Sequence, residues 1–129
     1  MAKKNNSPFE AWEQEQFFKW VYSNQIKYPE LQLINGSMNG VRVSPRIRAT
    51  LKAQGLRPGV PDIDVPIARL PYHGLRIELK RQSGGQVSQA QKHFHEALRK
   101  QGYLVHVCCG WREAVESVKD YLTIWDGIE

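Results

Sequence analysis

The chain has 129 residues, of which 41% are hydrophobic and 24% charged, which is enough for one ordinary core and too few for two. It contains no apolar run of about 18 residues and no signal peptide, so we expect a cytoplasmic location and no membrane partner. A single domain is expected over residues 1–129, with a flexible tail over residues 1–7.

The N-terminal part of the chain predicts a helix, a short strand and a second helix. Apolar residues at helical spacing indicate the first helix over about residues 8 to 24, and residues 31–34 are expected to form the short strand. Ser44 followed by Pro45 is typical of an N-cap with proline at the first helical position. Gly55 is expected to end this second helix.

The first predicted helix carries a carboxylate among its apolar side chains. At about 100° per residue, Glu13 falls inside one broad apolar arc of the helix, while Glu15 falls on the opposite, solvent-facing side. A carboxylate is costly to bury unless it is paired or binds an ion, so Glu13 is the better candidate for a metal contact. The alternative is that Glu13 lies at the edge of the arc and reaches solvent. The arc is formed by Phe9, Trp12, Phe17, Trp20 and Val21.

Positive charge is concentrated in the middle of the chain. Residues 31–102 hold 12 Lys/Arg and 4 Asp/Glu, whereas residues 103–129 hold 2 and 5. This excess favours an anionic polymer as partner, because neutralised phosphates release counterions. We hypothesise that one basic segment grips the phosphate backbone of a nucleic acid; the alternative is a solvated helix face without a partner. That segment supplies Arg42, Arg46, Arg48, Lys52 and Arg57.

Two strand-like runs follow, over residues 60–67 and 75–81, in which apolar and charged side chains alternate. Successive side chains of a strand point to opposite faces, so Asp62 shares a face with Asp64, and Glu78 shares one with Lys80. If the two strands pair, two or three carboxylates and a lysine converge.

Converging carboxylates repel one another, and a hard divalent cation that prefers oxygen ligands usually neutralises this repulsion. We therefore expect Mg²⁺ first. Such a cation keeps positions open for water and phosphate, which is hydrolytic chemistry. The alternative is that Glu78 and Lys80 belong to the solvated face of an ordinary edge strand. Pro61-Asp62 at the start of the first run favours the metal site.

The C-terminal half predicts a helix, a strand and a final helix. Ser88 and Gln91 have the spacing of a capping box, and Gly102 is expected to end the helix that they start. A strand is expected over residues 103–109. The helix before this strand carries Ala90, Phe94, Ala97 and Leu98 at helical spacing, and the helix after it carries Val115, Val118 and Leu122.

Cysteine and histidine patterns indicate no further site. Cys108 and Cys109 are adjacent in the predicted strand and point to opposite faces, so we expect buried free thiols and no mutual disulfide. His93 and His95 face different ways on the predicted helix, which disfavours a zinc pair.

Taken together, these motifs resemble the PD-(D/E)xK nuclease signature in its VRR-NUC branch, of the stand-alone phage or bacterial type. The resemblance extends over about residues 13–122. It implies an α/β fold with a restriction-endonuclease-like core, in which helices flank a mixed central β-sheet. It is carried by Pro61-Asp62 with its Gly59 entry, by Glu78-Leu79-Lys80, by Gln91 and by Gly102-Tyr103.

The resemblance also implies an activity. Asp62, Glu78 and the Leu79 carbonyl would hold Mg²⁺ or Mn²⁺ in a DNA endonuclease, and Lys80 would help to position the attacking water. Gln91 would join the site, together with a first-helix Glu that Glu13 matches; Asp64 stays open as a further carboxylate.

Members of this type are associated with homodimers that act on branched DNA such as Holliday junctions, in a bacterial or phage-infected cell. Two alternatives stay open for this chain. One is a nuclease acting on flap, nicked or linear duplex DNA. The other is a DNA-binding module without hydrolysis.

Overall fold

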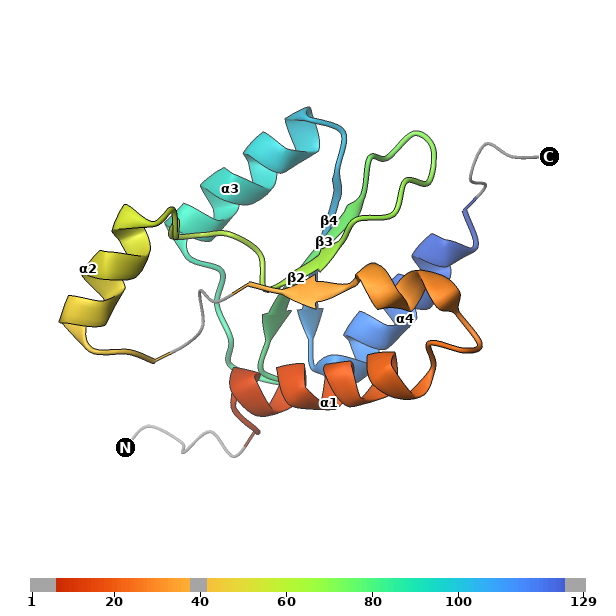
Figure 1. Ribbon diagram of the computed structural model, residues 1–129, viewed down its shortest axis with the longest axis horizontal. Helices are drawn as coiled ribbons and strands as arrows, with labels where there is room; N and C mark the ends of the chain where they lie inside the picture. The colour runs from red at the N-terminus through yellow and green to blue at the C-terminus, as the bar shows by residue number, and fades with distance from the viewer. Residues whose placement is uncertain (1–6, 38–41, 125–129) are drawn as a thin grey trace.

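The computed structural model describes residues 7–37 and 42–124 (Figure 1). Most of the tail expected over residues 1–7 therefore lies outside the described residues. Ser7, the last residue of that segment, is described, and its backbone carbonyl accepts a hydrogen bond from the Arg81 guanidinium. The chain is thus anchored to the end of the central sheet from Ser7 onward.

A mixed four-stranded sheet forms the centre of the fold, in the order β1-β2-β3-β4. β1 pairs antiparallel with β2, and β2 pairs antiparallel with β3, whereas β3 pairs parallel with β4. The parallel pair confirms the expected mixed α/β sheet, because a parallel return needs a crossover, here through a helix. The strands are Asn35–Gly36 (β1), Ile63–Val65 (β2), Leu75–Lys80 (β3) and Leu104–Cys109 (β4).

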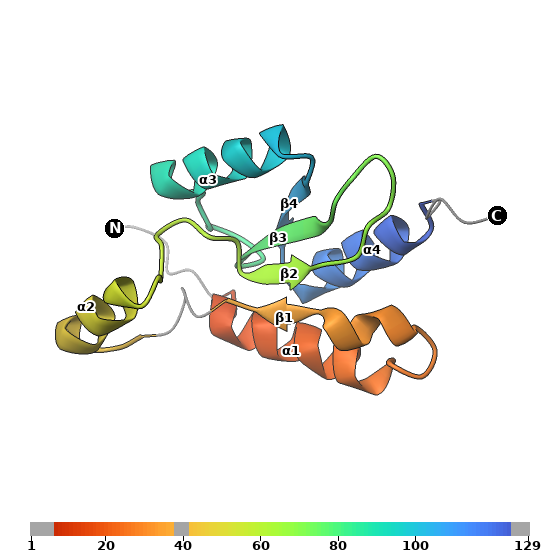
Figure 2. The same cartoon turned by 45° about the horizontal axis from the view of Figure 1, so that its top comes forward.

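Helices lie on both sides of this sheet. α1 (Glu10–Ser23) and α4 (Trp111–Leu122) pack against β3 on one side, and α3 (Gln89–Lys100) lies on the other (Figures 1 and 2). The apolar side of β3 has no exposed surface and belongs to the hydrophobic core. The charged side of β3 therefore faces α3. The core-facing side chains of β3 are Leu75, Ile77 and Leu79.

The strand expected over residues 31–34 is wrong. A short 3₁₀ helix, η1 (Pro29–Leu33), occupies most of that segment, and the strand follows it as β1. Pro29 has a fixed φ and no N–H group, which suits the first turn of a helix. Pairing begins only where Asn35 and Gly36 lie opposite β2.

α1 (Glu10–Ser23) begins two residues later than expected and buries a narrower stripe. Its buried residues are Glu13, Phe17 and Val21, spaced by four, which is the stripe that faces β3 and α4. Phe9 and Trp12 are 68% and 43% exposed, so their assignment to the core-facing arc is wrong. Phe9 precedes the helix as its N-cap residue, and Trp12 lies one position off the stripe.

The two predicted N-caps are confirmed. The Ser44 hydroxyl accepts a hydrogen bond from the Ile47 N–H at 3.3 Å at the start of α2 (Pro45–Ala53). Gly55 follows this helix at φ +109°, a conformation that favours glycine. The Ser88 capping box is complete at the start of α3.

α3 faces the sheet with different residues than expected. Its buried residue is His95, while Ala90 and Ala97 are exposed and Phe94 and Leu98 are half-buried. The reason is that α3 covers the charged side of β3, so a polar residue occupies the centre of the contact.

The thiols also differ from expectation in one respect. Cys108 and Cys109 are both free, as predicted, but only Cys108 is buried, because Cys109 points to the other face of β4. The final helix meets its expectation, since Val115 and Val118 are buried in α4.

Candidate active site

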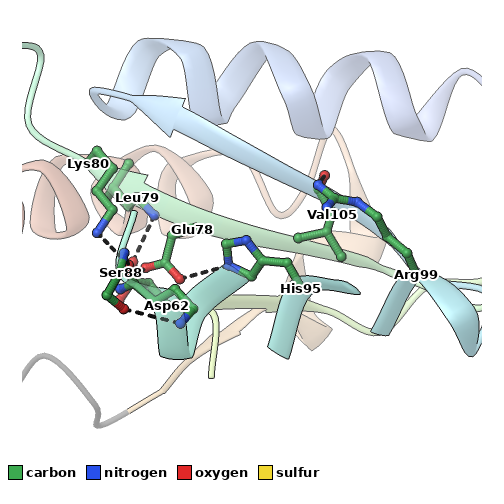
Figure 3. A network of polar contacts seen from close by, with 9 residues as sticks. Asp62, Glu78, Leu79, Lys80, Ser88, His95, Arg99 and Val105 are labelled. Atoms are coloured by element: carbon green, nitrogen blue, oxygen red, sulfur yellow. Dashed lines mark hydrogen bonds and ion pairs between the residues drawn. The ribbon is translucent and has the colours of Figure 1, made fainter. Parts of the chain in front are cut away.

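Strand pairing places the predicted acidic residues side by side. Ile63 pairs with Ile77 and Asp64 with Arg76, so the residue before β2, Asp62, comes next to Glu78. The Asp62 Oδ2 atom accepts a hydrogen bond from the Leu79 N–H at 2.7 Å, which fixes its carboxylate at the end of β3 (Figure 3). Asp62 and Glu78 therefore face the same side of the sheet, as the alternation predicts.

Two residues of α3 hold the Glu78 carboxylate, which is 1% exposed. Gln91 Nε2 donates to Glu78 Oε2 at 3.2 Å. His95 Nε2 lies 3.1 Å from Glu78 Oε1 (Figure 3). Gln91 and His95 are four residues apart and so share one helix face. α3 thus contacts both oxygens of this side chain.

Lys80 joins the same network. Its Nζ donates to Gln91 Oε1 at 3.0 Å, and the residue is 5% exposed. The Ser88 N–H donates to the same Gln91 oxygen at 2.9 Å as part of the capping box. Gln91 therefore caps α3 and contacts Lys80 and Glu78 at the same time, so its two predicted roles are compatible.

Burial strongly perturbs the electrostatics at Glu78. The pKa of Glu78 is raised from its ordinary 4.5 to about 9, first by burial and then by a hydrogen bond and negative charge from Asp62, against the opposing charge of Lys80. Ionising Glu78 at neutral pH thus calls for a further positive charge beside it. A divalent cation between Asp62 and Glu78 would meet this need, and carboxylate oxygens suit Mg²⁺ and Mn²⁺. In this respect the residues present fit the implied metal.

The protein would supply few ligands to such a metal ion. Among the described residues, no group of three or more His, Cys, Asp and Glu side chains is arranged to hold an ion. Asp62 and Glu78 would be the side-chain donors to such a cation, and Leu79, whose carbonyl the family resemblance adds, directly follows Glu78 in the chain. A cation bound by so few ligands keeps positions for water and phosphate.

Glu13 is buried, as its place in the helical arc predicts, and the alternative that it reaches solvent is wrong, since it is 0% exposed. Its Oε1 accepts from the Trp111 N–H and its Oε2 from Gln82 Nε2, each at 3.0 Å. Neither of these two hydrogen bonds joins Glu13 to Asp62 or Glu78. Glu13 links α1 to the first residue of α4 and to the loop that follows Lys80.

Asp64 and Arg76 form an ion pair of 2.8 Å on the same side of the sheet. The Arg76 guanidinium also lies 5.2 Å from the centre of the Tyr103 ring. The charge of Asp64 is thus balanced two residue pairs along the strands from Asp62 and Glu78. This arrangement gives Asp64 a partner of its own.

Two residues near the site were not anticipated from the sequence. His95 contacts Glu78, and its spacing of four from Gln91 is the signal that could have identified it. Glu10 adds to the negative charge felt by Glu78 and lines a groove together with Asp62. The corresponding signal is the spacing of three between Glu10 and Glu13 on one helix.

This groove, of about 970 Å³, leads along α1 to Asp62. Arg42 and Arg81 line it, and so do the aromatic rings of Phe9 and Tyr22, which are each 68% exposed. The groove offers cationic groups for phosphates and ring faces for bases beside one of the predicted metal ligands.

The basic segment reaches the site through a tightly packed loop. None of the residues of α2 is buried, and α2 stands apart from the sheet (Figures 1 and 2). After α2, Gly59 at φ +91° passes so close to α3 that a Cβ atom would lie 2.4 Å from the Ala90 carbonyl oxygen. Glycine is required there, and it places the basic segment next to the helix that holds Glu78. Arg42, Arg46, Lys52 and Arg57 are exposed, and Arg48 is half-buried.

None of the described helices is both long and apolar enough to cross a bilayer. A search of curated proteins finds no match. A solved structure described as "VRR_NUC domain protein" is similar over 95% of this chain and 94% of its own, with 30% sequence identity and a TM-score of 0.79. The family model of the VRR-NUC domain matches residues 5–111. The chain therefore belongs to the VRR-NUC family of nuclease domains, whose substrate is DNA.

Proposed function

We propose that the protein is an endonuclease that hydrolyses DNA phosphodiester bonds with Mg²⁺ or Mn²⁺, and that its preferred substrate is branched DNA such as a Holliday junction. The observation that carries the hydrolytic part is the meeting of Asp62, Glu78 and Lys80 beneath α3. Asp62 directly precedes β2, Glu78 and Lys80 lie in the second half of β3, and each of the three is held by a hydrogen bond. The catalytic groups are thus positioned before substrate arrives.

In this proposal Asp62, Glu78 and the Leu79 carbonyl hold the cation. When bound, the cation polarises a phosphoryl oxygen and makes a water molecule more acidic. Lys80 has three N–H donors, of which one is directed to Gln91 Oε1, so the others are available to a phosphate oxygen or the attacking water. Lys80 thereby stabilises the negative charge that develops at phosphorus.

Glu13 belongs to the proposed site from the side of α1. The family resemblance implies that it contacts the metal, whereas its contacts in the structure are with Gln82 and Trp111. We propose that it supports the site by holding the loop after Lys80. A direct contact with the cation would require Glu13 to give up one of these two hydrogen bonds.

The DNA backbone is proposed to lie along α2 and the groove beside α1. The exposure of the basic side chains and the absence of buried residues in α2 support this placement. Their contacts would position the phosphates without reading base sequence. The proposed phosphate contacts are Arg42, Arg46, Arg48, Lys52 and Arg57.

The preference for branched DNA and the homodimer are proposed together. One compact site cuts one strand at a time, so paired cuts in a junction are best made by two protomers related by a two-fold axis. The family resemblance supports this part of the proposal, and it also supports a cytoplasmic location in a bacterial or phage-infected cell.

The test compares four-way junction, flap, nicked and linear duplex DNA, each with Mg²⁺, Mn²⁺ or EDTA. We expect metal-dependent products, fastest from the junction. Asp62→Ala and Lys80→Ala should each slow cleavage by about 100-fold or more while DNA binding persists. Glu96→Ala, an exposed acidic position on α3, is the matched control and should cleave normally.

The same experiment separates the alternatives. Faster cleavage of flap, nicked or linear duplex DNA would replace the junction as preferred substrate. Binding without products under any metal would instead favour a DNA-binding module.

A further inference from the structure

Both oxygens of Glu78 are held from α3, which limits how this side chain can bind a cation. Gln91 engages Oε2 and His95 engages Oε1, so one lone pair on each oxygen is directed toward α3. The remaining lone pairs point away from α3. Asp62 lies next to Glu78 across the strand pairing, where its carboxylate accepts from the Leu79 N–H.

His95 is the residue of this pair that the sequence motifs do not include. Its side chain is 3% exposed, so its ring nitrogens cannot rely on bulk water. A neutral ring with its proton on Nε2 donates to Glu78 Oε1 across the observed 3.1 Å.

Gln91 by itself leaves the orientation of Glu78 underdetermined. Its side-chain oxygen already accepts from Lys80 and from the Ser88 N–H, so its position is set by the start of α3. One contact to one oxygen still allows the carboxylate to rotate about its last bond. A second contact to the other oxygen, from a rigid ring one helical turn later, removes that freedom.

We propose that His95 is a positioning residue that, together with Gln91, sets the orientation in which Glu78 binds the divalent cation. The inference rests on the proposed function, because it takes Glu78 to be a metal ligand. His95 contacts neither the cation nor the DNA in this role. It acts as the hydrogen-bonded neighbour that metal-binding side chains commonly have, whose loss weakens metal binding.

The test measures metal affinity directly, without DNA. Protein stripped of metal with EDTA and dialysed is titrated with Mn²⁺ in a calorimeter. His95→Leu places an apolar side chain of similar bulk at this position and removes the donor, and we expect it to weaken Mn²⁺ binding about 10- to 100-fold. His95→Gln retains an N–H donor and should recover most of the affinity.

The chain provides a matched control two residues earlier. His93 is an exposed histidine of the same helix, and His93→Leu should bind Mn²⁺ like the wild type. Cleavage gives a second readout: the Mg²⁺ concentration for half-maximal rate should rise in His95→Leu, while the rate at saturating Mg²⁺ changes less. Circular dichroism and thermal melting establish that each variant is folded.

The outcomes are separable. If His95→Leu is folded and binds Mn²⁺ as tightly as the wild type, the inference is overturned while the proposed function stands. If His95→Leu does not fold, His95→Met, which also lacks an N–H donor, takes its place: Mn²⁺ affinity equal to that of the wild type in this variant shows a purely structural role and overturns the inference. If the wild type neither binds Mn²⁺ nor cleaves DNA with any metal, the proposed function fails and this inference falls with it.

Discussion

Replacing Glu13 tests whether this buried carboxylate braces the fold or binds metal. Both of its oxygens accept hydrogen bonds in the protein interior, from groups 98 and 69 residues away in the chain. Glu13→Ala leaves the Trp111 N–H and Gln82 without their acceptor. Glu13→Gln keeps one acceptor oxygen and replaces the other by a donor, with little change in volume.

The structure sets the size of the effect. A hydrogen bond to a charged group contributes roughly 1.5 to 3 kcal/mol, so Glu13→Ala should lower the free energy of unfolding by about 3 to 5 kcal/mol. Glu13→Gln should lower it by about 1 to 3 kcal/mol. Trp111 is the first residue of α4, where a negative charge is favourable, so part of this loss is the interaction with the helix dipole.

The assay is urea unfolding in EDTA, followed by circular dichroism, with the slope on denaturant compared between variants. Glu15→Ala is the control, because Glu15 is exposed on the same helix and its removal should change stability by less than about 0.5 kcal/mol. Stability of Glu13→Gln equal to that of the wild type would refute the bracing role. If Mn²⁺ affinity then fell sharply, Glu13 would be a metal ligand.

Three further outcomes follow from the described contacts. Ser88→Ala removes the cap of α3 and should lower stability by about 1 kcal/mol in urea unfolding and slow cleavage, whereas normal cleavage would separate the cap from the active site. Arg46 and Arg48 replaced together by alanine should weaken DNA binding and reduce its salt dependence by about 2 in log-log slope, and an unchanged slope would exclude α2 from the phosphate contacts. Burial lowers the pKa of His106, so its contribution to stability is complete above pH 6.5 and is lost as the pH falls toward the folded-state value. Urea unfolding from pH 7 to 5 should therefore show a stability difference between wild type and His106→Gln that varies with pH, and a constant difference would contradict this.

The convergence of Asp62, Glu78 and Lys80 could be predicted because it depends on local periodicity. Alternation along each strand determines which side chains share a face, and one pairing of the two strands is then enough to bring them together. The caps at Ser44 and Ser88 are local in the same sense, since each involves a residue three positions away.

The predictions are wrong where a residue's burial or strand pairing depends on neighbours that are distant in the sequence. Phe9 belongs to the predicted arc but is exposed, because the hydrophobic core does not extend to the residue before α1. Residues 31–34 are apolar enough for a strand, yet pairing partners exist only for the next two residues.

The sequence by itself therefore determined the family, the mixed α/β core and the three charged residues in β3 and directly before β2. Only the tertiary structure decided what surrounds them: His95 on one oxygen of Glu78, and Trp111 and Gln82 on Glu13. The physical reason is that the periodicity of a helix or strand indicates which face of that element a side chain occupies. The periodicity does not indicate which other element packs against that face.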